Sequence, residues 1–252
     1  MSSLPLAHAS SSPALSLVFP VFDEEENLAE LLEGACKVGD ELAGNFEVVV
    51  VNDGSRDRSA EIIDTWAERE PRIRVIHHAR NSGYGAALRT GLAEAKGEWI
   101  FFSDSDLQFE LDQLRDLLVH AGHYEIVAGY RSPRRDPWPR LLIAKAWGAI
   151  VRVFFGLGVR DIDCAFKLFH REVIESIPLA SVGAFINTEL LVRARAAGFR
   201  IHQVPVRHRR RKRGRQTGAH PRVLLKACVE LGALYSELRR VTRKREAGTG
   251  PG

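Results

Sequence analysis

Short apolar runs alternate with longer amphipathic segments along the first half of the chain. Five of these runs are rich in β-branched and aromatic residues and predict strands, at residues 15–21, 47–51, 73–76, 99–103 and 125–129. Three of the amphipathic segments predict helices, at residues 25–42, 59–70 and 86–95. Apolar strands joined by helices are typical of a parallel sheet that is covered on both faces. The pattern therefore predicts an α/β fold.

The pattern changes after Arg131, where Pro133, Pro137 and Pro139 mark a loop. Beyond this loop the periodicity predicts an apolar helix at 141–155, a strand at 166–169, a helix at 188–197, a strand at 200–206 and a last helix at about 221–245. We therefore divide the chain into a flexible tail at 1–14, a first half at 15–131, a second half at 132–218, and a C-terminal helix and tail at 219–252.

The composition is that of an ordinary soluble protein. The chain has 252 residues, 45% of them hydrophobic, which is enough for a sizeable core. Its three cysteines are widely spaced and form no C-x-x-C pair, which argues against a disulfide framework or a zinc site and favours a reducing compartment. Residues 1–15 lack the features of a signal peptide, and Lys145 and Arg152 interrupt the most apolar stretch. We therefore expect a cytoplasmic protein or one bound peripherally to a membrane.

Positive charge is concentrated in one segment. The net charge of the chain is only +4, yet residues 207–215 contain seven Arg or Lys side chains. Such a run usually meets phosphate, whether in nucleic acid, in lipid headgroups or in a nucleotide. The alternative is a solvated loop without a ligand.

An acidic pair ends the predicted strand at 99–103, because Asp104, Asp106 and the amide of Gln108 follow it. Residues two apart in an extended segment point the same way, so the two carboxylates converge and repel each other. A magnesium or manganese ion removes this repulsion and keeps coordination positions for water or phosphate oxygens. The pair therefore indicates a divalent cation that binds a substrate diphosphate. The alternative is a solvated acidic turn.

Two other predicted strands also end in polar residues, at 20–24 and 52–57. In open sheets of this type ligands bind beyond the carboxyl ends of the strands, so we expect these segments to share one crevice with the acidic pair. There the ring of Phe22 can face a nucleobase, while Glu24 and Asp53 accept hydrogen bonds from a base or a ribose. The alternatives are carboxylates that favour the start of a helix and a simple turn.

Four motifs, taken in order, resemble the nucleotide-sugar domain of inverting family 2 glycosyltransferases. They are Pro-Val-Phe-Asp-Glu from Pro20, Asn-Asp-Gly-Ser from Asn52, Arg-Asn-x-Gly-x-Gly-x-Ala from Arg80, and Asp-x-Asp-Leu-Gln from Asp104. Within that family, later segments look like dolichol-phosphate mannose synthases and related polyprenyl-phosphate glycosyltransferases; these segments begin at Gly129, Asp161, Val204 and Arg211. The resemblance implies a fold of the glycosyltransferase A type, with a Rossmann-like, mostly parallel sheet flanked by helices and a C-terminal amphipathic helix.

The resemblance also implies which parts of the chain contact the substrates. The first half, 15–131, would bind the nucleotide sugar, and the second half, 132–218, with a basic loop at 207–217, would bind the acceptor. The nucleoside would be held by Pro20, Phe22, Glu24, Val51 and Asp53. Mg²⁺ or Mn²⁺ would be bound by Asp104, Asp106 and Gln108, with the small Ser105 between the carboxylates.

Three basic residues would meet the phosphates. Arg131 would contact the donor or acceptor phosphate, Arg211 would close over the diphosphate, and Lys167 would contact the acceptor phosphate. Asp106, Arg131 and Arg211 would thus be the catalytic residues. The chain departs from those synthases at three positions, with Phe22 in place of tyrosine, Asp23 in place of asparagine, and Thr217 in place of a phosphate-binding lysine.

The implied reaction is attack of an acceptor oxygen on the anomeric carbon, with inversion, as the nucleoside diphosphate leaves. A lipid phosphate is already ionised at neutral pH and needs no general base, whereas a sugar hydroxyl needs one. Glu189 is the candidate base for the second case. Its alternative role is a carboxylate that stabilises the start of a helix.

A lipid acceptor requires contact with a membrane. Apolar faces at 141–155 and 223–238, flanked by Arg and Lys, predict either interfacial helices or helices that pack against the domain.

We therefore expect a metal-dependent transferase that moves a mannose- or glucose-type sugar from a GDP- or UDP-sugar to a polyprenyl or dolichyl phosphate. It would act peripherally at the cytosolic membrane face, either alone or with a membrane-anchoring partner. We do not expect it to bind nucleic acid. The first alternative is transfer to a sugar or protein hydroxyl. The second is a nucleic-acid-binding protein that uses the basic run.

Overall fold

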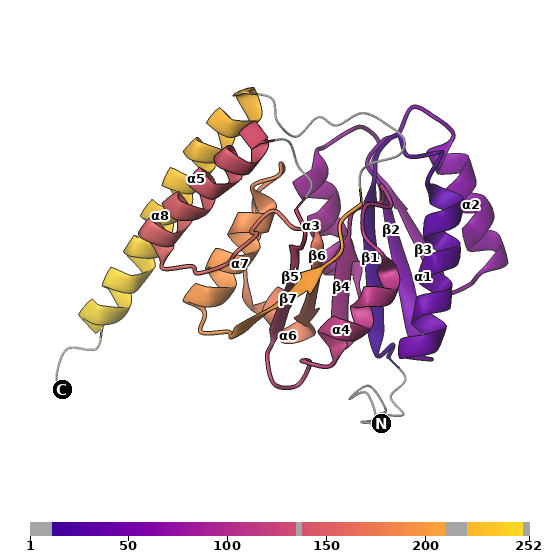
Figure 1. Cartoon of the computed structure of the whole chain (residues 1–252), viewed down its shortest axis with the longest axis horizontal. Helices are drawn as coiled ribbons and strands as arrows, with labels where there is room; N and C mark the ends of the chain where they lie inside the picture. The colour runs from indigo at the N-terminus through magenta and orange to yellow at the C-terminus, as the bar shows by residue number, and fades with distance from the viewer. Residues whose placement is uncertain (1–11, 135–137, 210–220, 249–252) are drawn as a thin grey trace.

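The computed structural model of the chain describes residues 12–134, 138–209 and 221–248, with side chains for 12–134, 141–209 and 227–240. Its centre is a seven-stranded sheet in the order β3-β2-β1-β4-β6-β5-β7 (Figure 1). The strands are β1 (Leu15–Val21), β2 (Phe46–Asn52), β3 (Ile73–His77), β4 (Trp99–Ser103), β5 (Ile126–Arg131), β6 (Phe166–His170) and β7 (Ile201–Val206). All seven strands were predicted from the hydrophobic pattern, to within two residues at each end.

The helices are α1 (Leu28–Leu42), α2 (Ser59–Arg69), α3 (Tyr84–Glu94), α4 (Leu114–Leu118), α5 (Trp138–Phe155), α6 (Arg171–Ser176), α7 (Ile186–Ala196) and α8 (Pro221–Gly248), with a 3₁₀ turn η1 (Leu111–Gln113) before α4. The pattern did not predict η1, α4 or α6. Each is too short to show a helical period in the sequence. Most of the predicted tail, residues 1–11, lies outside the described residues.

The strand order brings three strand ends together. β1 pairs in parallel with β2 on one side and with β4 on the other, so Phe22, Asp53 and Asp104 leave the sheet at the same edge. β6 is antiparallel to both β4 and β5, whereas β7 is parallel to β5. The prediction of a mostly parallel sheet flanked by helices is confirmed, and so is the expectation that the polar strand ends share one edge.

The central strands form the core on which this edge rests. Every residue of β1, β2 and β4 is buried. At the junction with β6, the rings of Phe101 and Phe166 meet edge to face at 4.7 Å, and those of Phe102 and Phe169 stack at 6.0 Å. Fully burying each such side chain stabilises the fold by about 1.5–3 kcal/mol, so the strands supply a rigid base for the residues at their ends.

Helices cover both faces of the sheet. α1 contacts α2 and η1, while α3 contacts β1, β2 and α6. α5 and α8 lie side by side at one end of the molecule, beyond α7 (Figure 1), where Phe154 and Phe155 of α5 meet the ring of Tyr235 in α8. In the described part of the chain, no helix combines the length and the apolarity needed to cross a membrane.

Candidate active site

The acidic pair lies on a tight turn at the end of β4. The hydroxyl of Ser105 donates to the carbonyl oxygen of Pro20 at 3.0 Å, which fastens the turn to the end of β1. Leu107 takes a left-handed conformation with φ of 56°, and the backbone N–H of Gln108 donates to Oδ1 of Asp106 at 3.2 Å. Pro20 and Ser105 thus act through the backbone and the turn, holding Asp104 and Asp106 at the shared edge.

The surroundings of the Asp104 carboxylate suit a bound cation. Its Oδ1 atom is buried and has no hydrogen-bond partner. Burial and the nearby charge of Asp106 raise the pKa of Asp104 to about 7. A buried carboxylate oxygen without a donor, next to a second carboxylate, is the donor set that a hard divalent ion would satisfy. Asp104, Asp106 and Gln108 are therefore suited to hold Mg²⁺ or Mn²⁺.

The remaining donors would have to come from the substrate or from water. Among the residues that the structure describes, no three His, Cys, Asp or Glu side chains gather as a complete metal centre. Magnesium commonly binds through one or two carboxylates plus substrate phosphates. A site with two carboxylates and an amide therefore suits a metal that arrives with a diphosphate.

A buried polar cluster lies beneath Asp104. Burial and the nearby charge of Asp104 raise the pKa of Tyr84. The positive charges of Lys167 and Arg131 act in the opposite sense on Asp104 and lower its pKa. Tyr84 was not among the predicted site residues, although it lies between the two glycines of a recognised motif.

The loops after β1 and β2 are fastened to each other. The backbone N–H of Asp23 donates to the hydroxyl of Ser55 at 3.0 Å, and Oδ1 of Asp23 accepts from the backbone N–H of Arg56 at 2.7 Å. Asp23 has a left-handed φ of 52°, and the ring of Phe22 beside it is 38% exposed. Phe22 is therefore available to a ligand at this edge, as the predicted nucleobase contact requires.

Glu24 is buried one residue further on. Its Oε2 atom accepts from the side-chain amide of Asn27 at 2.6 Å, and its backbone N–H donates to the hydroxyl of Ser59 at 3.0 Å. These contacts place the carboxylate at the start of α1 and next to α2. The predicted contact of Glu24 with the nucleoside stays a prediction.

Val51 does not reach the crevice with its side chain. It is fully buried in β2, where its backbone lies between Pro20 of β1 and Ile76 of β3, and its side chain faces Gly91 of α3. The side chain of Val51 therefore does not face the edge, and the predicted contact of Val51 with the nucleoside stays a prediction.

Asp53 orders the glycine-containing loop before α3. Its carboxylate accepts from the backbone N–H groups of Ser82 at 2.9 Å and Gly83 at 2.8 Å, and it meets Nδ1 of His78 at 2.7 Å. Gly83 has φ of 101°, and a Cβ atom there would clash with the carbonyl of Val182. Asp53 thus lies at the predicted edge, where its carboxylate is hydrogen-bonded to this loop. Its predicted contact with a base or a ribose stays a prediction.

Lys167 is not placed to bind a phosphate. Its side chain is fully buried, and its ammonium donates to the carbonyl oxygens of Ile162 at 3.1 Å and of Cys164, and to Oδ1 of Asn187 at 2.9 Å. Burial lowers the pKa of this ammonium. With all three donors used, Lys167 holds the loop before β6 against α7. The predicted contact with the acceptor phosphate is therefore corrected.

Replacing Lys167 with methionine should lower the free energy of unfolding by about 1–3 kcal/mol, because three buried acceptors lose their donor. The KM for the acceptor should stay within about twofold of wild type. Chemical unfolding and steady-state kinetics check these outcomes. Lys37→Met on the exposed face of α1 is the matched control. A tenfold rise in acceptor KM without loss of stability would restore the phosphate-binding role of Lys167.

The carboxylate of Glu189 is also engaged in structural hydrogen bonds. Its carboxylate accepts from the backbone N–H groups of Ala180 at 3.1 Å and Ser181 at 2.8 Å, and from Nε of Arg193 at 2.8 Å. It is buried, and Arg193 continues to Glu237 of α8 at 2.8 Å. Glu189 therefore holds a loop and a helix in place, which supports its structural alternative rather than the role of general base.

Arg131 ends β5 in a buried ion pair that the sequence did not indicate. Its Nε and Nη2 atoms donate to the two oxygens of Asp161 at 2.7 and 2.8 Å, and the side chains are 7% and 4% exposed. Arg134 adds a contact to Asp161 at 3.4 Å. Burial raises the pKa of Asp161, but the hydrogen bonds and charge of Arg131 hold it below its usual value. The phosphate contact predicted for Arg131 stays a prediction.

The basic run is described only at its start. Arg207 and Arg209 follow β7 and lie beside residues 108–110. The side-chain amide of Gln108 donates to the carbonyl oxygen of Arg209 at 3.0 Å, so the third predicted metal ligand lies next to this run. Arg211 and Thr217 lie outside the described residues.

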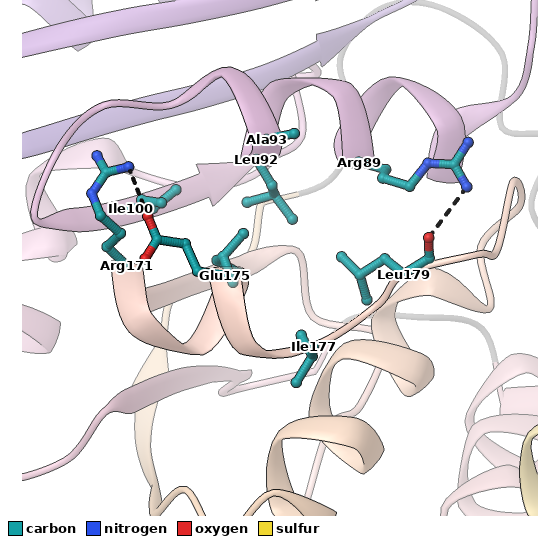
Figure 2. A pocket seen from close by; sticks show the side chains of 9 residues that line it. Arg89, Leu92, Ala93, Ile100, Arg171, Glu175, Ile177 and Leu179 are labelled. Atoms are coloured by element: carbon teal, nitrogen blue, oxygen red, sulfur yellow. Dashed lines mark hydrogen bonds and ion pairs between the residues drawn. The ribbon is translucent and has the colours of Figure 1, made fainter. Parts of the chain in front are cut away.

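A hollow of about 340 Å³ lies elsewhere, between α3 and α6 (Figure 2). Its two ends carry Arg89 and Arg171, and both guanidinium groups donate to backbone carbonyls, of Ala180 at 3.1 Å and of Gly97 at 2.6 Å. None of the predicted ligand-binding residues lines it. We interpret it as a gap between two helices, where Arg89 of α3 bonds to the loop after α6 and Arg171 of α6 bonds to the loop before β4.

Comparison with known sequences points to one family. The family described as "Glycosyl transferase family 2" matches residues 16–177. The glycosyltransferase AglD of Haloferax volcanii is 32% identical over 212 residues, which are 80% of this chain and 34% of that protein. The undecaprenyl-phosphate 4-deoxy-4-formamido-L-arabinose transferase of Edwardsiella ictaluri is 30% identical over 203 residues, which are 79% of this chain and 61% of that protein. The chain therefore spans between about a third and three fifths of these relatives.

Solved structures share the fold. Glucosyl-3-phosphoglycerate synthase from Mycobacterium tuberculosis in complex with UDP superposes with a TM-score of 0.65 at 20% identity, over 89% of this chain and 80% of that one. The same synthase with Mn²⁺, UDP and glucosyl-3-phosphoglycerate gives 0.61 at 21% identity, over 92% and 80%. Staphylococcus aureus TarS with UDP-GlcNAc gives 0.56 at 19% identity, over 80% and 59%. The fold is thus of the glycosyltransferase A type, as the motifs implied.

Proposed function

The chain belongs to glycosyltransferase family 2, and from this membership and the edge formed by β1, β2 and β4 we propose that it transfers a sugar from a nucleotide-sugar donor to a polyprenyl phosphate. One observation carries the proposal most directly. Asp104 presents a buried oxygen without a hydrogen-bond donor, beside Asp106, where the three strand ends meet. This is where the diphosphate of a donor would need a cation.

Each part of the edge has a proposed task. Phe22, Glu24 and Asp53 would face the nucleoside, and Asp104, Asp106 and Gln108 would hold Mg²⁺ or Mn²⁺. The bound ion would supply electrostatic stabilisation of the negative charge that develops on the departing nucleoside diphosphate. Arg131 and the basic run would orient the phosphates, because guanidinium groups bind phosphate oxygens in a fixed geometry.

The acceptor is proposed to be a lipid phosphate. The relatives from Edwardsiella and Pseudomonas carry undecaprenyl phosphate in their names, and the basic run suits a phosphate group. An ionised phosphate oxygen needs no general base, and Glu189, the base candidate from the sequence, is engaged with Arg193 and a loop. The alternative acceptor, a sugar or protein hydroxyl, would require a base that the described residues do not offer at Glu189.

The decisive experiment is a transfer assay. The protein is incubated with MnCl₂ or MgCl₂, a panel of labelled nucleotide sugars that includes GDP-mannose and UDP-glucose, and a short polyprenyl phosphate. We expect label in the organic phase with one donor. Label on a soluble sugar alone would favour the hydroxyl alternative, and no transfer from any donor would overturn the proposal. A rise in melting temperature with Mn²⁺ plus GDP or UDP would identify the nucleoside, because ligands that bind the native state stabilise it.

We further propose that α5 lies on an anionic membrane surface. Its outward arc exposes large apolar side chains, namely Leu142, Ile143, Ile150 and Val153. A neighbouring side packs inward: Val151 is buried, and Nε1 of Trp147 donates to Oγ1 of Thr188 in α7 at 3.1 Å. The charged residues of α5 are all basic, and Lys145 and Arg152 are exposed. An apolar face with basic residues along it favours anionic lipid over a neutral surface.

This membrane contact predicts a clear effect of charge. Val153→Asp should reduce the fraction of protein that sediments with vesicles of phosphatidylglycerol and phosphatidylcholine by at least about threefold, because a carboxylate is repelled by an anionic surface and costly in its apolar layer. The matched control is Val119→Asp at the end of α4, a valine that is 63% exposed compared with 81% for Val153. Unchanged sedimentation would refute the contact. A change in oligomeric state in place of lipid binding would assign this face to a second copy of the chain.

A further inference from the structure

The start of the basic run is paired with the residues that follow the acidic pair. After β7, residues 207–209 run antiparallel to residues 108–110, with a bridge between Phe109 and His208. The backbone N–H of Arg209 donates to the carbonyl of Gln108 at 2.7 Å, and the side-chain amide of Gln108 donates to the carbonyl of Arg209 at 3.0 Å. The two segments therefore form a short connection two residues beyond Asp106.

One carboxylate joins both arginines of this connection. Oε1 of Glu110 accepts from Nε of Arg209 at 2.9 Å and meets its Nη2 at 2.5 Å, and Oε2 accepts from Nη1 of Arg207 at 3.2 Å. The side chain of Glu110 is 17% exposed, while those of Arg207 and Arg209 are 72% and 54% exposed. Gln113 adds a hydrogen bond, because its Oε1 accepts from the backbone N–H of Arg207 at 2.8 Å.

The charge pattern explains why a carboxylate is needed here. Arg207 and Arg209 are two residues apart in an extended segment, so their side chains point the same way and repel each other. They also begin a run with seven positive charges in nine residues. Single exposed ion pairs contribute little, but a mostly buried carboxylate shared by two guanidinium groups forms a small network. Glu110 offsets the repulsion at the point where the run meets the sheet.

We propose that Glu110 is a positioning residue that fixes the start of the basic run beside the turn carrying Asp106 and Gln108. This inference rests on the proposed function. In that function a donor diphosphate binds between a cation and basic side chains, and the connection would hold these two in place. Glu110 acts through Arg207, Arg209 and the turn and contacts neither substrate nor ion. Without Glu110, the turn that carries Asp106 and Gln108 and the start of the basic run would lose their fixed separation.

The first test measures the connection itself, without activity. Trypsin cleaves after arginine, and cleavage of a native protein follows the population of locally open states. Brief digestion of Glu110→Gln followed by mass spectrometry should show cleavage after Arg207 and Arg209 at least about threefold faster than in wild type. Glu125→Gln is the matched control, since Glu125 pairs with Arg200 at 2.6 Å directly before the neighbouring strands β5 and β7. It should leave cleavage after Arg207 and Arg209 unchanged.

The second test measures the consequence for the site. Glu110→Gln should lower kcat/KM for the donor about tenfold to a hundredfold and weaken binding of Mn²⁺ with nucleoside diphosphate, measured by calorimetry, because loss of a residue that orients ligands has effects of this size. A purely structural role would lower the melting temperature and leave both quantities unchanged. Glu110→Asp should recover part of the loss, because it keeps the negative charge.

A double-mutant cycle separates the possible outcomes. If Glu110 acts through Arg209, the variant carrying both Glu110→Gln and Arg209→Gln should be no worse than the single variants. Normal turnover in Glu110→Gln would overturn the inference, even with faster cleavage. Lower turnover with unchanged cleavage would also overturn it, because the effect would not run through the connection. If the wild type itself transfers no sugar, the proposed function fails, and the cleavage and calorimetry results still decide whether Glu110 holds the run.

Discussion

Replacing Asp106 with asparagine is expected to reduce sugar transfer by at least about a hundredfold while the protein remains folded. Loss of one group that stabilises the developing charge in a transition state typically costs two to three orders of magnitude. Asp106 lies on the turn at the end of β4, and its charge raises the pKa of Asp104. Asparagine keeps the shape of the side chain but removes the charge that would hold a cation.

The loss should appear in both turnover and metal binding. In Asp106→Asn, the rise in melting temperature with Mn²⁺ and nucleoside diphosphate should largely disappear, while the melting temperature without ligand should stay the same or increase slightly, because repulsion of Asp104 is relieved. Asp116→Asn on the exposed side of α4 is the matched control and should behave as wild type. A fully active Asp106→Asn protein would exclude this carboxylate as an essential ligand.

The hydrophobic pattern contained enough information for the sheet and for its functional edge. β1 and β2 are buried along their whole length, so each is a mostly apolar run, and polar residues follow within two positions of its end. The carboxyl ends of neighbouring parallel strands meet by geometry alone, which is why Phe22, Asp53 and Asp104 could be placed together. Short elements such as α6 gave no such signal, because six residues complete fewer than two helical turns.

The roles of individual charged residues were harder to predict, because the sequence gives residue types and not their partners. Lys167 lies in β6 between Phe166 and Leu168, a strand that is buried on both faces. A lone lysine in such a run has no solvent side, and this could have indicated a buried structural cation. Glu189 has Arg193 four residues later, the spacing of a helical ion pair, which was a usable signal for its structural role.

Contacts between distant segments were beyond the reach of the pattern. Glu110 and Arg209 are separated by 99 residues, and Arg131 and Asp161 by 30. Nothing local distinguishes these carboxylates from the solvated ones on α1 and α2. The pairing of β4, β6, β5 and β7 brings the partners together, so a single sequence identified the edge of the site but not the ion pairs that support it.

The ion pair at the end of β5 should prove the most sensitive to removal of one partner. Asp161→Asn is expected to lower the free energy of unfolding by about 3–5 kcal/mol, because it leaves the guanidinium of Arg131 buried with a neutral partner. For a chain of this size the melting temperature should fall by roughly 6–20 °C. Denaturant unfolding gives the free energy directly. Glu125→Gln, which breaks an exposed pair with Arg200, should cost about 1 kcal/mol or less.

The pH dependence of stability distinguishes a lost ion pair from a general packing defect. Although burial raises the pKa of Asp161, Arg131 holds it below the usual value, so its contribution to stability is present above about pH 3.9 and is lost as the pH falls through the lower folded-state pKa. As the pH falls below about 4, the free energy of unfolding of Asp161→Asn should therefore decrease less than that of wild type. If its stability falls with acid as steeply as that of wild type, the pair with Arg131 is not the source of the destabilisation.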